Sequence, residues 1–246
     1  MLTAIALVAV ILALWLLAAL YVILRLGIGL HQAMLYVPLK VLFRVKDRPM
    51  LVARAAQPPI IYAVWHQSRL EPALMLSLLP ADTLHILDED SARAWWLDPW
   101  RALARTIVFN ARHVFVSRRL VRRLRGGGRL AVYLPDDEAP DPKAFRLFRA
   151  IARIAQNAEA RIVPIHVDGA GRTFFSLAPE KEGRRLAPRL SILTLEPQTI
   201  AEMVASAEGE KPLGANAFFD RMIAVRRSVA RKEDGDHEEG DSRIAA

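Results

Sequence analysis

The chain of 246 residues contains no cysteine. This absence excludes disulfide bonds, thiolate metal sites and a cysteine nucleophile, and it fits a domain that faces the cytoplasm. Acidic residues are also scarce, since 26 Asp and Glu stand against 34 Lys and Arg for a formal net charge of +8. The excess of positive charge favours anionic partners: phospholipid headgroups, phosphorylated substrates, acidic carrier proteins or nucleic acid.

The beginning of the chain lacks charge and proline. Every residue from Ala4 to Leu24 is apolar or aromatic, and a run of about 20 such residues matches the thickness of a bilayer core. The rival interpretation is a cleaved signal peptide, but no Lys or Arg precedes the run and the run is longer than a typical signal-peptide core. We therefore predict a transmembrane anchor over residues 1–26. Positive charge follows from Arg25 onward, which places the remainder on the cytoplasmic side of the inner membrane.

The rest of the chain divides by composition. Residues 27–57 are expected to form an interfacial or linking segment, with continuation of the first helix or packing on the main domain as alternatives. Gln57-Pro58-Pro59 is a breaker, after which residues 58–230 are expected to form the main domain. Residues 231–246 are mostly charged or small, and this composition predicts a disordered tail.

Apolar, β-rich runs alternate with helical patterns across the main domain. This alternation predicts an α/β fold, a mixed central sheet flanked by helices and preceded by the transmembrane helix. Strands are expected at 60–65, 83–87, 113–116, 129–135, 161–167 and 189–195.

The sharpest local feature is the sequence WHQSRLEP, from Trp65 to Pro72. A strand brings His66 to its carboxyl edge, where α/β proteins place ligands. A carboxylate at Glu71 that accepts from one ring nitrogen would leave the other nitrogen to take a proton from an alcohol. Two structural alternatives stand beside this reading, because His66 could be an ordinary strand-end histidine and Ser68-x-x-Glu71 also has the pattern of a helix capping box.

Several segments in a fixed order resemble the glycerophospholipid acyltransferase family, whose first motif is H-x-x-x-x-D. The resemblance covers about residues 59–200 and includes WHQSRLE, ARAWWLDPWRAL, RLAVYLPDD, RIVPIHVDGAGRTFFS and APRLSILTLEP. Within the family it is strongest to the 2-acylglycerophosphoethanolamine acyltransferase domain of the bifunctional acyltransferase/acyl-carrier-protein synthetases. The resemblance implies a mixed αβ fold behind membrane-associating helices, with His66 and Glu71 as the catalytic pair.

The resemblance also indicates which residues would bind the acceptor lipid. Arg118, in FVSR, stands where the family's second motif has an arginine that contacts acceptor phosphate, and a solvated arginine face is the alternative. Leu134-Pro135-Asp136-Asp137 stands in the place of F-P-E-G, so Pro135, Asp136 and Asp137 are the remaining substrate-binding candidates. Two departures affect these motifs, Glu71 in place of the usual Asp and Asp137 in place of a glycine.

The function implied is membrane-bound O-acyl transfer to a lysophospholipid or related glycerophosphate acceptor. The donor would be a thioester of acyl carrier protein or coenzyme A, and no cofactor, metal or nucleic acid is expected. Two alternatives remain: a lipid A-type secondary acyltransferase, which shares H-x-x-x-x-E and a P-D-containing third motif, and a catalytically decayed membrane-binding relative.

Overall fold

The centre of the protein is a six-stranded sheet in the order β3-β2-β4-β1-β5-β6. In this computed structural model the described residues are 2–87, 94–103, 105–108, 114–136, 142–177, 183–206 and 213–242. The first five strands in the chain pair in parallel and β6 runs antiparallel to β5. The strands are β1 (Ile60–His66), β2 (Leu84–Leu87), β3 (Arg105–Val108), β4 (Arg129–Pro135), β5 (Arg161–Asp168) and β6 (Ser191–Thr194).

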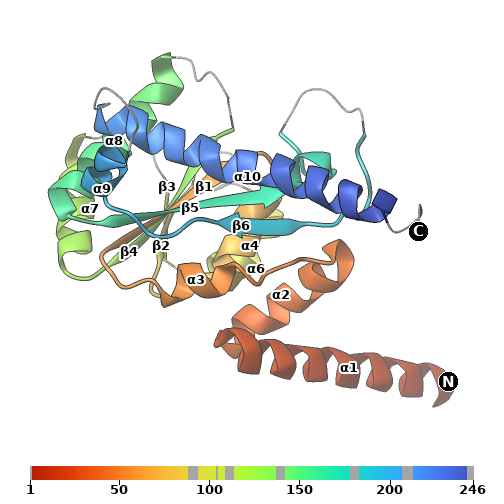
Figure 1. The fold of residues 1–246 in the computed structure, drawn as a ribbon. Coiled ribbons are helices and arrows are strands. Elements are labelled where there is room, and N and C mark those ends of the chain that lie inside the picture. The colour runs from red at the N-terminus through yellow and green to blue at the C-terminus, as the bar shows by residue number, and fades with distance from the viewer. Residues whose placement is uncertain are drawn as a thin grey trace.

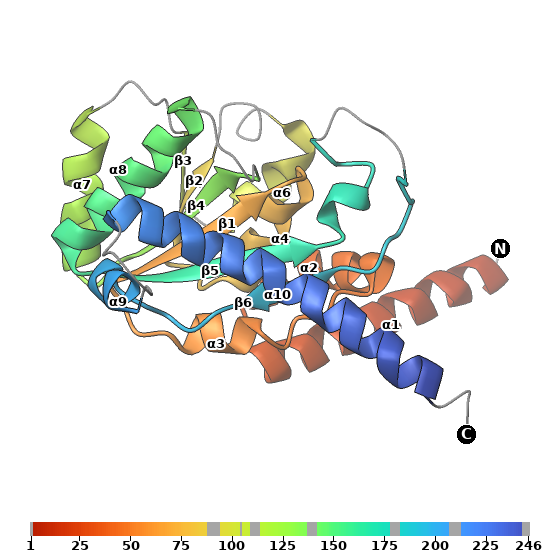
Figure 2. The same cartoon turned by 45° about the horizontal axis from the view of Figure 1, so that its top comes forward.

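Helices cover both faces of this sheet (Figure 1). One face carries α2 and α4, and the other carries α7, α8, α9 and α10 (Figures 1 and 2). The helices and turns are α1 (Leu2–Leu26), α2 (Leu30–Phe43), α3 (Met50–Ala55), α4 (Leu70–Leu78), η1 (Trp95–Leu97), α6 (Asp98–Arg101), α7 (Val114–Arg125), α8 (Pro142–Ala158), η2 (Ala170–Arg172), α9 (Ile200–Ala205) and α10 (Gly214–Ser242).

The strand β1 divides two apolar cores because its side chains alternate between the faces. Ile60, Tyr62 and Val64 join the core under α2 and α4, whereas Ile61 and Ala63 join the core under α8 and α10. Burial on both faces is the environment of a central parallel strand, which reads as a continuous apolar run. The mixed α/β fold predicted from the alternation of strands and helices is thus confirmed.

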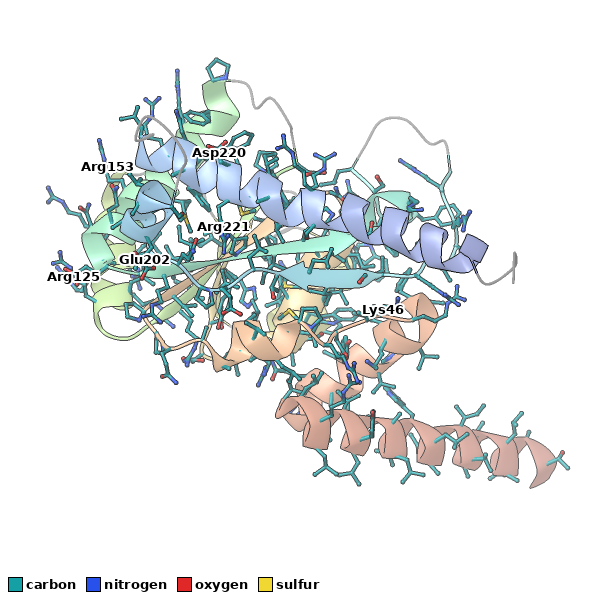
Figure 3. The ribbon with its side chains drawn as sticks, in the orientation of Figure 1. Lys46, Arg125, Arg153, Glu202, Asp220 and Arg221 are labelled. Atoms are coloured by element: carbon teal, nitrogen blue, oxygen red, sulfur yellow. The ribbon has the colours of Figure 1, made fainter. Side chains whose placement is uncertain are left out.

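The helix α1 is long and apolar enough to cross a membrane, a test that a signal sequence near the N-terminus also passes. Only its last part packs on the protein, through Ala19, Val22 and Leu26, which are buried and lie on one helical face. Figure 3 shows the side chains of the remaining part projecting into the surroundings. Side chains such as Leu7 (61% exposed) and Leu17 (62% exposed) therefore lack protein contacts that would remove them from water.

A polar cluster ties α1 to the segment that follows it. The buried carboxylate of Asp47 accepts from the Tyr36 hydroxyl at 2.7 Å and pairs with Lys40. Arg25, in the last turn of α1, reaches the same carboxylate at 3.4 Å. One turn before Tyr36 on α2, the Gln32 amide donates to the carbonyl of Leu79 at 2.8 Å. Segment 27–57 thus contains two helices, and this hydrogen bond joins α2 to the C-terminal end of α4.

One region differs from the sequence prediction. The strand predicted at 113–116 is wrong, because Val114 begins α7. The strand that precedes this helix is β3, which ends at Val108. The reason is the helical period that continues from Val114: Leu120 and Leu124 are buried, while Arg122 and Arg125 are exposed. The described part of α10 extends to Ser242, and the disordered tail expected over 231–246 stays a prediction.

Candidate active site

His66 is the last residue of β1, between β4 and β5 at the carboxyl edge of the parallel strands. The strand register places it directly opposite Pro135, the last residue of β4. The first and third motif-like segments, about 70 residues apart in the chain, therefore meet at one edge. This is the edge at which open α/β sheets bind ligands.

Glu71 lies in the first turn of α4 and is fully buried. Its Oε2 lies 3.5 Å from the Nδ1 of His66. The same carboxylate accepts from the backbone N–H of Ser68 at 2.8 Å and of Gln67 at 3.2 Å. Glu71 thus contacts His66 and also accepts from the Ser68 N–H, which is one half of the capping-box pattern, while the Ser68 hydroxyl accepts from the Leu70 N–H instead of the Glu71 N–H.

The electrostatics of Glu71 are set by opposing effects. Complete burial raises the pKa of the Glu71 carboxyl, and the contacts with His66 and the Ser68 amide act in the opposite direction. The charged form of Glu71 is therefore disfavoured by burial and favoured by the contacts with His66 and Ser68. A carboxylate held in this way fixes the orientation of the imidazole beside it.

Aromatic and histidine rings line the sheet beside His66. The ring of Tyr133, on β4, lies edge-on to His66 with centroids 5.8 Å apart, and it stacks on His85 at 6.3 Å. The Tyr133 hydroxyl lies 3.0 Å from the Nδ1 of His85, which is fully buried on β2. Burial lowers the pKa of His85 to about 3, so this ring is neutral wherever the protein is folded near neutral pH.

The buried neutral His85 gives the protein a pH-dependent stability. Because the pKa of His85 is lower in the folded chain than in the unfolded chain, protonation of the unfolded state destabilises the fold as pH falls through about 6.5 toward 3. Between about pH 7.5 and pH 5 the parent should lose roughly 2 kcal/mol more unfolding free energy than His85→Asn, which does not titrate. Chemical denaturation of both proteins at the two pH values measures this difference, and equal losses would contradict it.

A second polar group lies at the same edge, on the side that α10 covers. Asp136 follows β4 directly and accepts from the Nε2 of Gln67. Its other oxygen pairs with Arg226 of α10 at 3.3 Å. His166 on β5 is buried, and burial lowers its pKa while the nearby Asp136 acts to raise it. The aspartate in the third motif-like segment is thus tied both to the residue after His66 and to α10.

The loop after β5 closes over the residues that follow His66. The Oγ of Ser68 lies 3.2 Å from the Oγ1 of Thr173, and the N–H of Arg69 donates to the carbonyl of Phe175 at 2.9 Å. The N–H of Leu177 donates to the carbonyl of Gln67 at 2.8 Å. These bonds make the 169–177 segment, which the sequence singled out by its resemblance, a wall of the site.

Gly169 is the first residue of this loop, and its backbone conformation sets the direction of the chain after β5. Its φ is +82°, and a Cβ there would lie 2.4 Å from the Arg189 carbonyl oxygen. Gly169→Ala should therefore destabilise the protein by roughly 2–4 kcal/mol, from left-handed strain and from the clash. The control is Gly127→Ala, at φ +76° with open space around it, which should cost about 1 kcal/mol from strain alone. Thermal unfolding of both variants makes the comparison, and equal losses would show that the Arg189 contact is unimportant.

The other predicted site residues have different outcomes. Arg118 lies in α7 and is exposed, and among the described residues no contact joins it to His66 or Glu71. Asp137 lies outside the described residues. In the part of the chain that the structure describes, no group of three His, Asp or Glu side chains could hold a metal ion.

Sequence reasoning missed four residues: Gln67 and Arg226, which contact Asp136 at this edge, and His85 and Tyr133, which pair within the sheet beside His66. Gln67 could have been noticed, since it follows His66 directly. Arg226 could not, because it lies 90 residues from Asp136 and belongs to an arginine-rich helix with no distinguishing pattern.

The fold is similar to a solved structure, although no protein-family model matches the chain. The fold is similar to the crystal structure of the 1-acyl-sn-glycerophosphate acyltransferase PlsC from Thermotoga maritima, with a TM-score of 0.51 over 85% of this chain and 88% of that chain. The two sequences are 14% identical. The chain therefore has a glycerophospholipid acyltransferase-like fold, and its reaction must be argued from the site because one fold can support many functions.

Proposed function

We propose that this protein transfers a fatty acyl group from a thioester to the hydroxyl of a lysophospholipid or related glycerophosphate acceptor, with His66 as the general base. The observation that carries the proposal is the contact between His66 and the buried Glu71 at the carboxyl edge of the sheet. An acyltransferase-like fold around this pair is the second support.

In the proposed reaction, the Nε2 of His66 takes the proton of the acceptor hydroxyl as its oxygen attacks the thioester carbonyl carbon. The C–S bond then breaks, and the leaving thiolate takes the proton back from the imidazolium, so that His66 is regenerated. Glu71 contacts Nδ1, which keeps Nε2 as the reacting nitrogen and stabilises the positive charge on the ring. No protein nucleophile is needed, since a thioester is already an activated acyl donor.

The acceptor side is assigned to the end of β4 and to α7. Pro135 lies opposite His66, and Asp136 is held by Gln67 and Arg226, so this segment can present a fixed wall to the acceptor. Asp137 continues the segment. Arg118 is proposed to bind the acceptor phosphate, for which a planar guanidinium is suited. The donor is proposed to be an acyl thioester of acyl carrier protein or coenzyme A, without a further cofactor.

The membrane is proposed as the place of the reaction. The exposed apolar part of α1 has the length and hydropathy to enter a bilayer. Arg25 at its end, followed by Lys40, Arg44 and Lys46, favours a cytoplasmic position for the sheet domain at the inner membrane. A lysophospholipid acceptor would then reach His66 without leaving the membrane surface.

A second candidate acceptor is a lipid A precursor. The spacing His66-x-x-x-x-Glu71 and the Pro135-Asp136 pair occur in that branch of lipid acyltransferases, and Asp136 here lies at the same edge as His66. This candidate shares the base and the donor and differs only in the alcohol that is acylated.

An acceptor panel distinguishes these functions. Purified full-length protein in mixed micelles is given labelled acyl–acyl carrier protein or acyl coenzyme A, together with lysophosphatidate, lysophosphatidylethanolamine or a lipid A precursor. We expect kcat/KM for one glycerophospholipid acceptor to exceed that for the lipid A precursor by roughly tenfold or more, since a site built for one polar headgroup rejects another. Faster transfer to the lipid A precursor would support the second candidate, and no transfer to any acceptor would indicate a catalytically decayed relative.

A further inference from the structure

Large apolar side chains are exposed in two segments beside the site. Trp95 is 82% exposed, Phe174 57%, Phe175 38% and Leu177 45%. We call these four residues the aromatic rim. Isolated exposed apolar residues are ordinary, but a connected group of this size beside a functional site indicates a contact surface.

The two segments of the rim form one body with the site. The ring of Trp96 lies 5.4 Å from the ring of Phe175 and 6.1 Å from the ring of Trp100, which joins η1 and α6 to the loop after β5. Backbone bonds from Arg69 to Phe175 and from Leu177 to Gln67 attach that loop to the residues after His66. The rim is therefore positioned by the same contacts that build the site.

The tryptophans behind the rim and the anchor helix pack on the same core cluster. Trp96 and Trp100 are partly buried against the core cluster that contains residues of α1 and α2, and Trp15 of α1 packs on the same cluster. In Figures 1 and 2, α1 extends from beneath α2 past the carboxyl end of β5, the end of the sheet that carries the rim. A bilayer that takes up the free part of α1 would consequently meet the carboxyl edge first.

Positive charge accompanies the rim. Arg69 is bonded through its backbone to Phe175, Arg172 ends η2, and Arg185 is bonded through its N–H to the carbonyl of Arg172. All three side chains are exposed. Exposed aromatic rings with arginines around them match the boundary between acyl chains and anionic headgroups, where amphipathic rings are favoured and basic side chains are attracted to the lipid charge.

From these observations we propose that the aromatic rim is a second membrane-contact surface, which inserts into an anionic bilayer and holds the carboxyl edge of the sheet against it. This surface would have a role that the anchor lacks. With α1 as the single attachment, the domain stays near the membrane but can rotate about that attachment. A second attachment near His66 fixes that orientation. The proposal concerns bilayer contact and does not depend on the acyl-transfer reaction.

The absence of cysteine allows a direct test with the full chain. Single cysteines replace Trp95 or Phe174, each is labelled with an environment-sensitive fluorophore, and the protein is reconstituted in phosphatidylethanolamine–phosphatidylglycerol vesicles that contain nitroxide-labelled lipid. We expect nitroxide near the headgroup boundary to remove roughly half of the emission at both positions, because interfacial side chains lie only about 5–10 Å deep.

The matched control is a cysteine at Leu213, which is 76% exposed and directly precedes α10 at the other end of the sheet. Its label should retain nearly all its emission. Equal quenching at the three positions, or none at Trp95 and Phe174, would overturn the proposal. Protection of the Trp95 label by acyl carrier protein, without quenching by nitroxide lipid, would identify the rim as a protein-docking surface and would overturn it equally.

A second measurement separates orientation from anchoring. The double variant Trp95→Ser, Phe174→Ser should stay in the vesicle fraction through α1 but show about a tenfold weaker quenching at a Leu177→Cys label. Circular dichroism and thermal unfolding check that the variant is folded, as expected for exposed positions. Undiminished quenching at Leu177 would show that the rim does not set the orientation of the domain.

Discussion

Replacing His66 with alanine should lower kcat for acyl transfer by roughly three orders of magnitude, because a positioned general base contributes 10²–10⁴-fold to such a reaction. The protein should remain folded and vesicle-bound, since the ring lies at the end of β1 and the cores below it are complete without it. Steady-state kinetics with the best acceptor from the panel, together with circular dichroism, make the measurement.

The matched control is His31→Ala. His31 lies in α2, is exposed, and has no role in the proposed reaction, so this variant should keep the activity of the parent. A His66→Ala protein that transferred acyl groups at the parental rate would refute the proposed base. Loss of activity in both histidine variants would instead indicate a general effect on the protein.

Glu71→Gln should lower kcat by roughly 100-fold with little change in the KM for either substrate, because the amide loses the charge that stabilises the imidazolium but still fills the same space. Its effect on stability should be smaller than that of removing the side chain, because two contributions oppose each other. The amide has one acceptor oxygen for the two N–H groups of Ser68 and Gln67, which weakens one of these hydrogen bonds. Against this loss, burial raises the pKa of Glu71, so ionisation of this side chain costs folding free energy above the pKa of the unfolded chain. The glutamine variant removes that cost. Steady-state kinetics and thermal unfolding measure the two effects.

Glu71→Ala completes the comparison. It removes the acceptor for the N–H groups of Ser68 and Gln67 and leaves a cavity under the loop, so we expect a loss of about 2–4 kcal/mol in addition to the loss of activity. If the glutamine variant kept the parental kcat while the alanine variant lost both stability and activity, Glu71 would be a capping residue and not the partner of His66.

The parts that sequence predicted well are those that depend on short-range patterns. The cores of β1, β4 and β5 are continuous apolar runs because both faces of each strand are buried, and His66 and Glu71 are only five residues apart in the chain. The strand predicted at 113–116 failed for the same reason, since four residues alone cannot distinguish a strand from the first turn of α7. The resemblance to the bifunctional acyltransferase/acyl-carrier-protein synthetases stays a prediction.

Other parts of the site could not be predicted because they depend on contacts between distant residues. The pairing of Asp136 with Arg226, the stacking of Tyr133 on His85 and the bonds between Ser68 and Thr173 each join different elements. A single sequence carries no information about which of its many arginines meets Asp136. The same limit applies to Arg118, whose placement on α7 is described but whose phosphate contact remains a prediction.

The attachment of α10 to the sheet has a consequence for biosynthesis. The indole N–H of Trp65, the neighbour of His66, donates to the carbonyl of Met222 at 2.8 Å, across 157 residues of chain, and Arg226 secures Asp136 nearby. Synthesis proceeds from the N-terminus, so under the proposed anchoring α1 enters the bilayer while the ribosome is still making the segment that completes this edge. Nascent chains and truncated products that stop before Met222 are thus expected to accumulate at the membrane in an inactive form. The chain would then reach the membrane before its active site is complete.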